Sequence, residues 1–450
     1  MKDNRDSIDF AKDNITKLYN KILFPTLLGM LFMASYTVCD GIIVGLGVGS
    51  DALAAVNIAA PLFMVGTGVS LMFGAGSSVV AAIHLSKGKN KAANINITQA
   101  TFIPIIFMII ISTIVMSFCK ETAYLLGSSE KLMPLVVDYL HWYIPFLSFF
   151  VPSCVGMFII RLDGSPRYAM MCNIIPALVN IILDLIFVFP LGYGIKGAAF
   201  ASSAGMIVST VMVIIYMTRY NKILHFYRLK ISRKSAMLTC RNLGYMVKVG
   251  FSALFGELAI SCMMIVGNYR FIEILGEDGV AAFSVVCYCL PLVFMFNTAL
   301  TQSAQPIISF NHGAKLFQRE RKAFLLSLYY GVLTSIILSI IFFLGSKYIV
   351  AAFLSTQCNA YNIAVKGLSL FATGFVFFAM NITFIGYFQS IEKAIPATVF
   401  TLIRGIVAMT LCFIFLPYLI GSNGLWFAVP TSELITFIMI IIYYLKKGRE

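Results

Sequence analysis

The chain has 450 residues, of which 60% are hydrophobic and only 12% are charged. Its mean hydropathy of +0.90 excludes an ordinary soluble protein and predicts an all-α polytopic membrane protein, because only helices or closed barrels can span a bilayer. The formal net charge of +14 does not indicate a nucleic-acid-binding protein, since the basic residues gather in short loops, as orientation determinants do.

Apolar segments of membrane-spanning length recur along the whole chain, and we expect twelve of them. Several exceed the roughly 20 residues that a bilayer requires, so we expect tilted or kinked helices. The approximate limits of the spans are 20–46, 52–83, 94–119, 133–160, 168–190, 196–217, 243–269, 279–310, 322–345, 362–388, 395–417 and 424–445.

Lys and Arg concentrate in alternate loops, which predicts that both termini are cytoplasmic. The first 21 residues lack the apolar core of a signal peptide, and they are expected to form a short amphipathic lead-in at the membrane surface. Short loops and the absence of long tails favour a bacterial inner membrane.

The chain divides into two similar halves. The strongly basic connection 218–242 separates an N-terminal six-helix lobe, 1–217, from a C-terminal six-helix lobe, 243–450. Pro190 and Pro417 correspond at an offset of about 227 residues, as do Gly197 and Gly424. Because six spans are an even number, the two halves have the same orientation, and two such bundles are expected to face a central cavity suited to alternating access.

Ionisable groups within the spans are the candidate functional residues. Asn180 and Asp184 are one helical turn apart on one face, and Asp40 lies in the first span. A charged side chain at membrane depth costs roughly 2.5–3.5 kcal/mol on insertion scales. With the Ser202 hydroxyl, these groups offer an oxygen set for Na⁺ or for a shared proton. The alternative is a buried hydrogen-bonding cluster that only joins helices.

The second half carries weaker candidates. Glu257 is expected either to couple a second ion, to bind a cationic substrate, or to lie at a water-accessible helix end. For Glu433, the alternatives are a role in ion coupling and a purely structural pairing with another residue. Phe, Tyr and Met are abundant, and they can line a cavity that binds varied organic cations.

No residue pattern indicates an enzyme. The four His and ten Cys show no metal-ligand spacing, and no phosphate-binding Gly-Lys-Ser/Thr motif is present, so ATP is not the expected energy source. We therefore expect no cofactor and no metal beyond a possible Na⁺. The expected partners are small-molecule substrates and the lipid bilayer, without nucleic acid, and the expected oligomeric state is a monomer.

The chain resembles the multidrug and toxic compound extrusion (MATE) family of secondary transporters. The resemblance rests on Asp40–Gly45 with Leu53–Val56, the loop Asp163–Arg167, the stretch Asn180–Phe189, and Gly197–Ala199. It is similar above all to the DinF-like branch, in which the counterparts of Asp40, Asn180 and Asp184 form an N-lobe cation site, and Ser202 stands where Thr is common. The span 362–388 lacks the carboxylate of the NorM-like branch, although Glu257 resembles that branch's seventh-span glutamate.

The resemblance implies twelve helices in two pseudo-symmetric bundles around a V-shaped cavity. It also implies antiport, with export of drugs or organic compounds, cationic ones above all, in exchange for Na⁺ or H⁺. Two other functions are weighed against this one. A flippase or exporter of a lipid-linked or other endogenous metabolite would need a cationic cavity, and Arg404 is the one clear base within the spans. A membrane-embedded enzyme would need the catalytic set that the sequence lacks.

Overall fold

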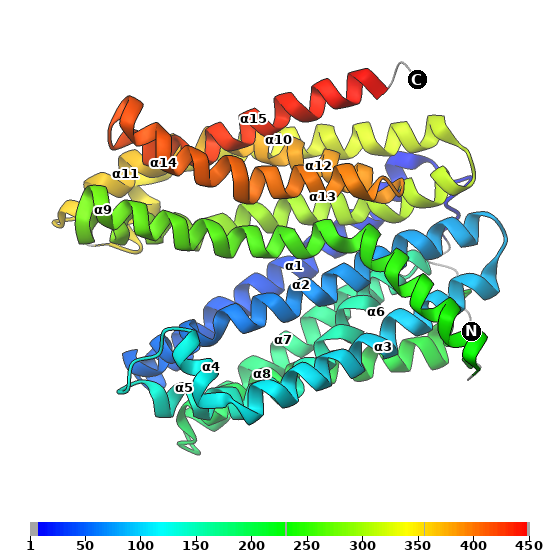
Figure 1. The fold of residues 1–450 in the computed structure, drawn as a ribbon, viewed down its shortest axis with the longest axis horizontal. Coiled ribbons are helices and arrows are strands. Elements are labelled where there is room, and N and C mark those ends of the chain that lie inside the picture. Colours follow the sequence, from blue (N-terminus) through cyan, green and yellow to red (C-terminus); the bar gives the residue numbers. More distant parts are fainter. Residues whose placement is uncertain (1–7, 230–231, 355, 448–450) are drawn as a thin grey trace. The chain divides into compact units, whose positions relative to one another are not determined.

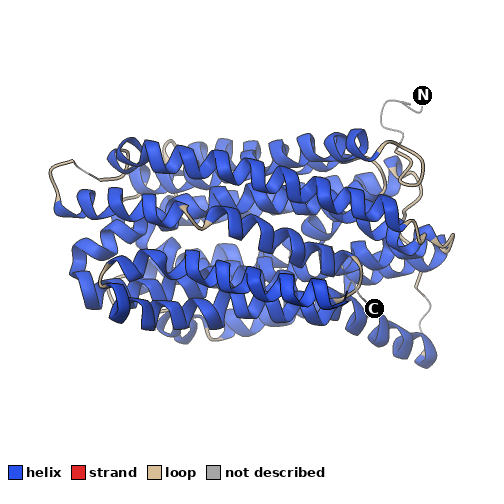
Figure 2. Cartoon of the chain, turned by 90° about the horizontal axis from the view of Figure 1, so that it is seen from above, coloured by secondary structure: helices blue, strands red, loops and turns tan. Residues whose placement is uncertain are grey.

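The computed structural model describes residues 8–229, 232–354 and 356–447, and within these ranges all regular structure is helical (Figure 2). The first half of the chain forms eight α-helices, here called α1 to α8 (Figure 1). Their bounds are α1 Ile15–Gly47, α2 Ser50–Ser86, α3 Asn90–Ser117, α4 Cys119–Leu125, α5 Met133–Tyr143, α6 Phe150–Leu162, α7 Pro166–Val188 and α8 Gly194–Ile215. A 3₁₀ segment η2, Ile144–Phe149, joins α5 to α6, and a π-helical turn η3, Tyr216–Tyr220, continues α8.

The second half is helical in the same way. Its elements are α9 Arg233–Gly313, α10 Phe317–Ala351, α11 Asn359–Ala372, α12 Phe375–Ser390, α13 Ala394–Leu402, α14 Ala408–Ile420 and α15 Asn423–Lys447. A π-helical turn η4, Ile403–Val407, joins α13 to α14 so that the three run as one span.

The twelve predicted spans agree with these helices. Ten helices of the described chain are long and apolar enough to cross a membrane, with α9 counted once. At 81 residues, α9 would be about 120 Å long if straight, four times the bilayer core, and the left-handed φ of +66° at Gly276 breaks it into two spans. The pair α11 and α12, bent by 45°, supplies the remaining span.

The chain forms two compact units. Unit 1 comprises residues 1–254 and 309–317, and unit 2 comprises residues 255–308 and 318–450. The sequence-based limits of the two lobes and of the connection between them remain a prediction.

The basic connection after η3 is held on unit 1 by a buried carboxylate. Asp163 accepts hydrogen bonds from the backbone N–H groups of three consecutive residues, Lys222 to Leu224, at 2.7–2.9 Å, and from the Tyr216 hydroxyl at 2.8 Å. Further along, Asn94 of α3 accepts a hydrogen bond from the His225 N–H. These bonds satisfy backbone groups that an irregular segment would otherwise leave unpaired.

Two glycines allow the backbones of α2 and α9 to touch. A Cβ atom at Gly76 would lie 2.1 Å from the Met246 carbonyl oxygen, and one at Gly250 would lie 1.9 Å from the Met72 carbonyl oxygen. Small residues at such crossings let membrane helices associate closely. The contact therefore fixes the first part of α9 against unit 1.

We expect Gly250→Ala to destabilise the protein, because the added methyl group overlaps backbone that cannot turn aside. Overpacking of this kind costs about 1–3 kcal/mol. Gly244→Ala on the same helix is the matched control, since nothing lies within 4 Å of a Cβ there. Melting temperatures of the purified proteins in detergent measure the difference. Equal melting temperatures for the two variants would contradict the close helix contact.

Candidate functional site

Three helices of unit 1 carry the predicted cation site. Asp40 lies on α1, Asn180 and Asp184 lie on α7, and Ser202 lies on α8. Helix α7 packs along both α1 and α8. At Gly205, a Cβ would lie 3.3 Å from the Pro176 carbonyl oxygen, so this glycine lets α8 approach α7 closely. The structure thus brings together all four residues that the sequence proposed.

The side chain of Asn180 connects two members of the site. With its nitrogen toward Asp184 and its oxygen toward Ser202, the amide donates to Asp184 Oδ2 at 3.2 Å and accepts from the Ser202 hydroxyl at 3.2 Å. This orientation gives each atom of the amide a partner of the right type. Asn180 is only 2% exposed, so these bonds lie in the packed interior, and they fix the direction of the Asp184 carboxyl group.

Asp40 and Asp184, here called the carboxyl pair, face each other closely enough to interact directly. Asp184 is fully buried and Asp40 is half-buried. The Oδ1 atom of each is inaccessible and has no hydrogen-bond partner within the described residues. A buried carboxylate oxygen without a partner is costly, and one such atom on each of two interacting carboxyl groups marks a site that a cation or a proton would complete.

The chemistry of the carboxyl pair suits Na⁺ or a proton. Carboxylate, amide and hydroxyl oxygens are all hard donors, and two carboxyl groups in contact can share one proton because they cannot both ionise cheaply. A transition metal is not favoured, since the described residues contain no group of three or more His, Cys, Asp or Glu side chains arranged to hold one. Among the described residues of unit 1, no Lys, Arg or His forms an ion pair with either carboxyl group.

Three tyrosines next to the carboxyl pair were missed by the sequence reasoning. Tyr36 precedes Asp40 by one turn of α1, and Tyr139 and Tyr143 lie on α5; all three lie near Asp40. The rings of Tyr139 and Tyr143 stack at 5.3 Å. The i, i+4 spacing of both pairs was a signal in the sequence, but it did not reveal that the tyrosines of α5 come near Asp40 of α1.

The candidates in the second half lie in unit 2 and have different surroundings. Glu257, on α9, has no hydrogen bond or ion pair with any described residue. Glu433, on α15, is only 3% exposed and forms an ion pair with Arg404, with 2.9 Å between Nε and Oε1. Asn381 donates to the other Glu433 carboxylate oxygen at 2.6 Å. Of the two alternatives for Glu433, the structural pairing is therefore present.

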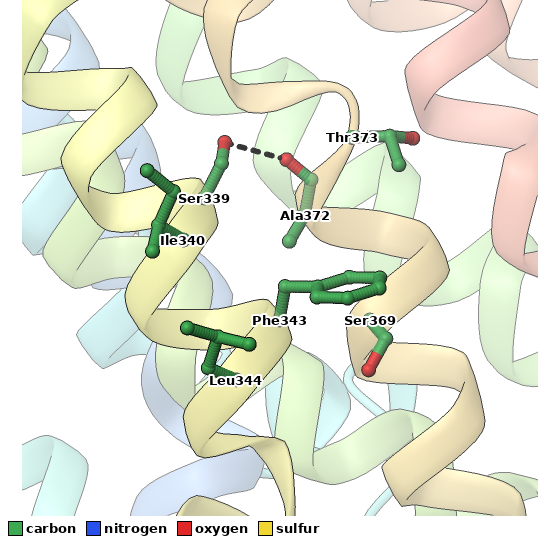
Figure 3. A pocket seen from close by; sticks show the side chains of 7 residues that line it. All are labelled: Ser339, Ile340, Phe343, Leu344, Ser369, Ala372 and Thr373. Carbon is green, nitrogen blue, oxygen red and sulfur yellow. Dashed lines mark hydrogen bonds between the residues drawn. The ribbon is translucent and has the colours of Figure 1, made fainter.

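A cavity of about 320 Å³ in unit 2 lies where α11 breaks into α12 (Figure 3). Its walls are mainly apolar and come from α10 and from the end of α11, with Phe343 and Leu344 largely exposed. Ser339 donates a hydrogen bond to the Ala372 carbonyl at 2.8 Å, which satisfies a carbonyl near the bend. The cavity has no charged lining residue and is not the candidate ion site.

Comparison with known proteins gives consistent similarities over the full chain. The family described as MatE matches residues 25–186 and 253–414, one match in each half. The multidrug export protein MepA of Staphylococcus haemolyticus is 21% identical over 445 residues, covering 98% of this chain and 96% of the relative. MepA of Staphylococcus aureus is also 21% identical, over 447 residues.

Solved structures share the fold. A transporter of the MOP superfamily from Pyrococcus furiosus has a TM-score of 0.89 at 19% identity, with 97% of each chain covered. A multidrug resistance MATE family transporter in an outward-facing conformation has the same TM-score at 20% identity, again with 97% of each chain covered.

We expect Asp184→Asn to melt at the same temperature as the wild type or at a higher one, because the amide removes one of two acidic groups that face each other in the packed interior. Asp163→Asn is the matched comparison. It places an amide nitrogen against backbone N–H groups and leaves a donor unpaired, at a cost of about 1–3 kcal/mol, so its melting temperature should fall. If Asp184→Asn fell as far as Asp163→Asn, Asp184 would be a structural residue that only holds the helices together.

Proposed function

Because the chain belongs to the MatE family of membrane transporters, we propose that it is a secondary antiporter that exports organic compounds in exchange for Na⁺ or H⁺. The observation that carries this proposal is the carboxyl pair, with its two buried and unpartnered oxygen atoms. Charged groups within membrane spans are usually functional. The relatives named above are called multidrug export proteins, which supports drug-like or other organic substrates for this chain as well.

The proposed mechanism couples two binding events through the state of the carboxyl pair. An ion that enters from outside binds Asp40 and Asp184, cancels their repulsion and favours the conformation that releases substrate outward. Departure of the ion to the inside restores the charge and resets the cycle. Such coupling requires the ion to have different affinities for the two conformations.

We further propose that the chain belongs to the DinF-like branch. The support is the set Asp40, Asn180, Asp184 and Ser202 in unit 1, together with the lack of Asp or Glu in α11 and α12. On this proposal, ion coupling depends on unit 1 and not on unit 2. A bacterial inner membrane, cytoplasmic termini and a monomeric state belong to the same proposal.

A flippase of lipid-linked substrates is the less favoured alternative. A pyrophosphate group needs several uncompensated cations, whereas the charge of Arg404 is balanced by Glu433. A membrane-embedded enzyme is disfavoured because the relatives are transporters.

The test is efflux of a fluorescent organic cation, ethidium, from proteoliposomes under a Na⁺ gradient and, separately, under a pH gradient. We expect wild-type efflux to follow one of the gradients and to fall at least about tenfold in Asp40→Asn and in Asp184→Asn, because the driving ion loses its site. Asp51→Asn is the matched control, since Asp51 forms an ion pair with Lys131 in which both side chains are at least half exposed.

Three results are decisive for the antiport proposal. Efflux that persists in both carboxyl-pair variants would exclude coupling at this site. Wild-type efflux that ignores both gradients would exclude antiport driven by these ions. Loss of efflux in Asp51→Asn as well would show that the assay reports a general loss of charge or folding.

A further inference from the structure

A second polar cluster lies inside unit 2, whereas the carboxyl pair belongs to unit 1, and we call it the Arg404 cluster. Its members are Arg404 on η4, Glu433 on α15, and Asn381 and Phe378 on α12. Arg404 is 8% exposed, Glu433 is 3% exposed and Asn381 is fully buried. Arg404 lies near the middle of the span Ala394–Ile420, where a charged side chain is costly and, as a rule, has a function.

The described residues satisfy only part of the hydrogen-bonding capacity of the Arg404 guanidinium group. Its Nε atom lies 2.9 Å from Glu433 Oε1, and its carbon lies 4.6 Å from the centre of the Phe378 ring. No described residue accepts a hydrogen bond from either terminal nitrogen. These nitrogens are also not among the fully enclosed polar atoms that lack a partner, so each keeps some accessible surface although Arg404 as a whole is buried.

Arg270, in the same unit, differs in that each of its three guanidinium nitrogens has an acceptor. Its Nε donates to the Phe413 carbonyl at 3.2 Å, one terminal nitrogen pairs with Glu273, and the other donates to the Ile414 carbonyl at 3.4 Å. Arg404 has one ionic partner, and its four terminal N–H groups have no acceptor among the described residues. This difference indicates that the terminal nitrogens of Arg404 can donate hydrogen bonds to a ligand.

The local backbone supports a binding role. Arg404 lies within the π-helical turn η4, Ile403–Val407, and such turns inside α-helices occur frequently at functional sites. Glu433 and Phe378 hold the guanidinium from two directions, so its orientation is set before any ligand arrives. A preorganised guanidinium fork matches the two oxygens of a carboxylate.

We propose that the Arg404 cluster binds the carboxylate of a small monocarboxylic compound through the terminal nitrogens of Arg404. The adjacent Glu433 carboxylate repels groups that carry more than one negative charge, which limits the ligand to a monoanion. Phe378 is buried beneath the guanidinium and holds its plane in place. That such compounds are exported rests on the proposed function. Their binding does not, and on this account the substrates include organic anions and zwitterions.

The test measures equilibrium binding of 1-naphthoate, 1-naphthamide and 1-naphthyl phosphate to the purified full-length protein in detergent, without any ion gradient. We expect the wild type to bind 1-naphthoate at least about tenfold more tightly than the neutral amide and more tightly than the phosphate. The double variant Arg404→Gln/Glu433→Gln should lose this preference. It removes both charges together, so it avoids the uncompensated buried carboxylate that Arg404→Gln alone would leave.

Two controls separate this site from the rest of the protein. Arg270→Gln should keep the preference for 1-naphthoate, because the terminal nitrogens of Arg270 already have partners. Asp40→Asn should also keep it, because the carboxyl pair is not part of the cluster. Retention of the preference in the double variant, or its absence in the wild type, would overturn the proposal.

The result is distinguishable from that of the antiport experiment. Ion-driven ethidium efflux without preferential 1-naphthoate binding would leave antiport standing and exclude the Arg404 site. Preferential 1-naphthoate binding that the double variant loses, in a protein without ion-driven efflux, would establish the site and exclude antiport by these ions.

Discussion

The proposed activity depends on two carboxyl groups held against each other inside an apolar helix bundle. Asp184 is fully buried, and Asp40 contacts it from a different helix. The free energy of placing them there is unfavourable unless a positive charge or a proton joins them. Two features hold the Asp184 side chain in position: the hydrogen bond from the Asn180 amide, and the close packing of α8 on α7 at Gly205. The residues around the carboxyl pair are thus held in place, whereas no described residue of unit 1 neutralises the charge of the pair.

The buried charged side chains have different partners in the two units. In unit 2, Arg404 and Glu433 neutralise each other, and Asn381 adds a hydrogen bond. In unit 1, the carboxyl pair has no basic partner among the residues that the structure describes. A pair of opposite charges gains little from a coupling cation, whereas two facing carboxyl groups gain much from one, so a cation gradient is expected to act on the carboxyl pair. This contrast is why we assign ion coupling to unit 1 and ligand recognition to the Arg404 cluster.

The sequence predicted the helical architecture well because hydropathy constrains every residue that crosses a bilayer. The predicted span 243–269 and the span 279–310 lie on either side of the break at Gly276. Asp40, Asn180, Asp184 and Ser202 were also found from the sequence, because polar residues in apolar runs stand out; their role stays a prediction. Tyr139 and Tyr143 were missed, since which helices meet at a given depth depends on packing that a single sequence does not encode locally. The ion pair of Arg404 with Glu433 was not predicted for the same reason, because the two residues lie on different helices.

The most direct test of the central claim is the thermodynamic linkage between ion and substrate. Ethidium binding to the purified protein would be measured across a range of Na⁺ concentrations and, separately, of pH, for the wild type and for Asp40→Asn. The account predicts that one of the two ions weakens ethidium binding to the wild type, that ethidium weakens binding of that ion by the same factor, and that Asp40→Asn removes the effect. Ethidium affinity that is independent of both ions in the wild type, or an ion effect that survives in Asp40→Asn, would contradict it.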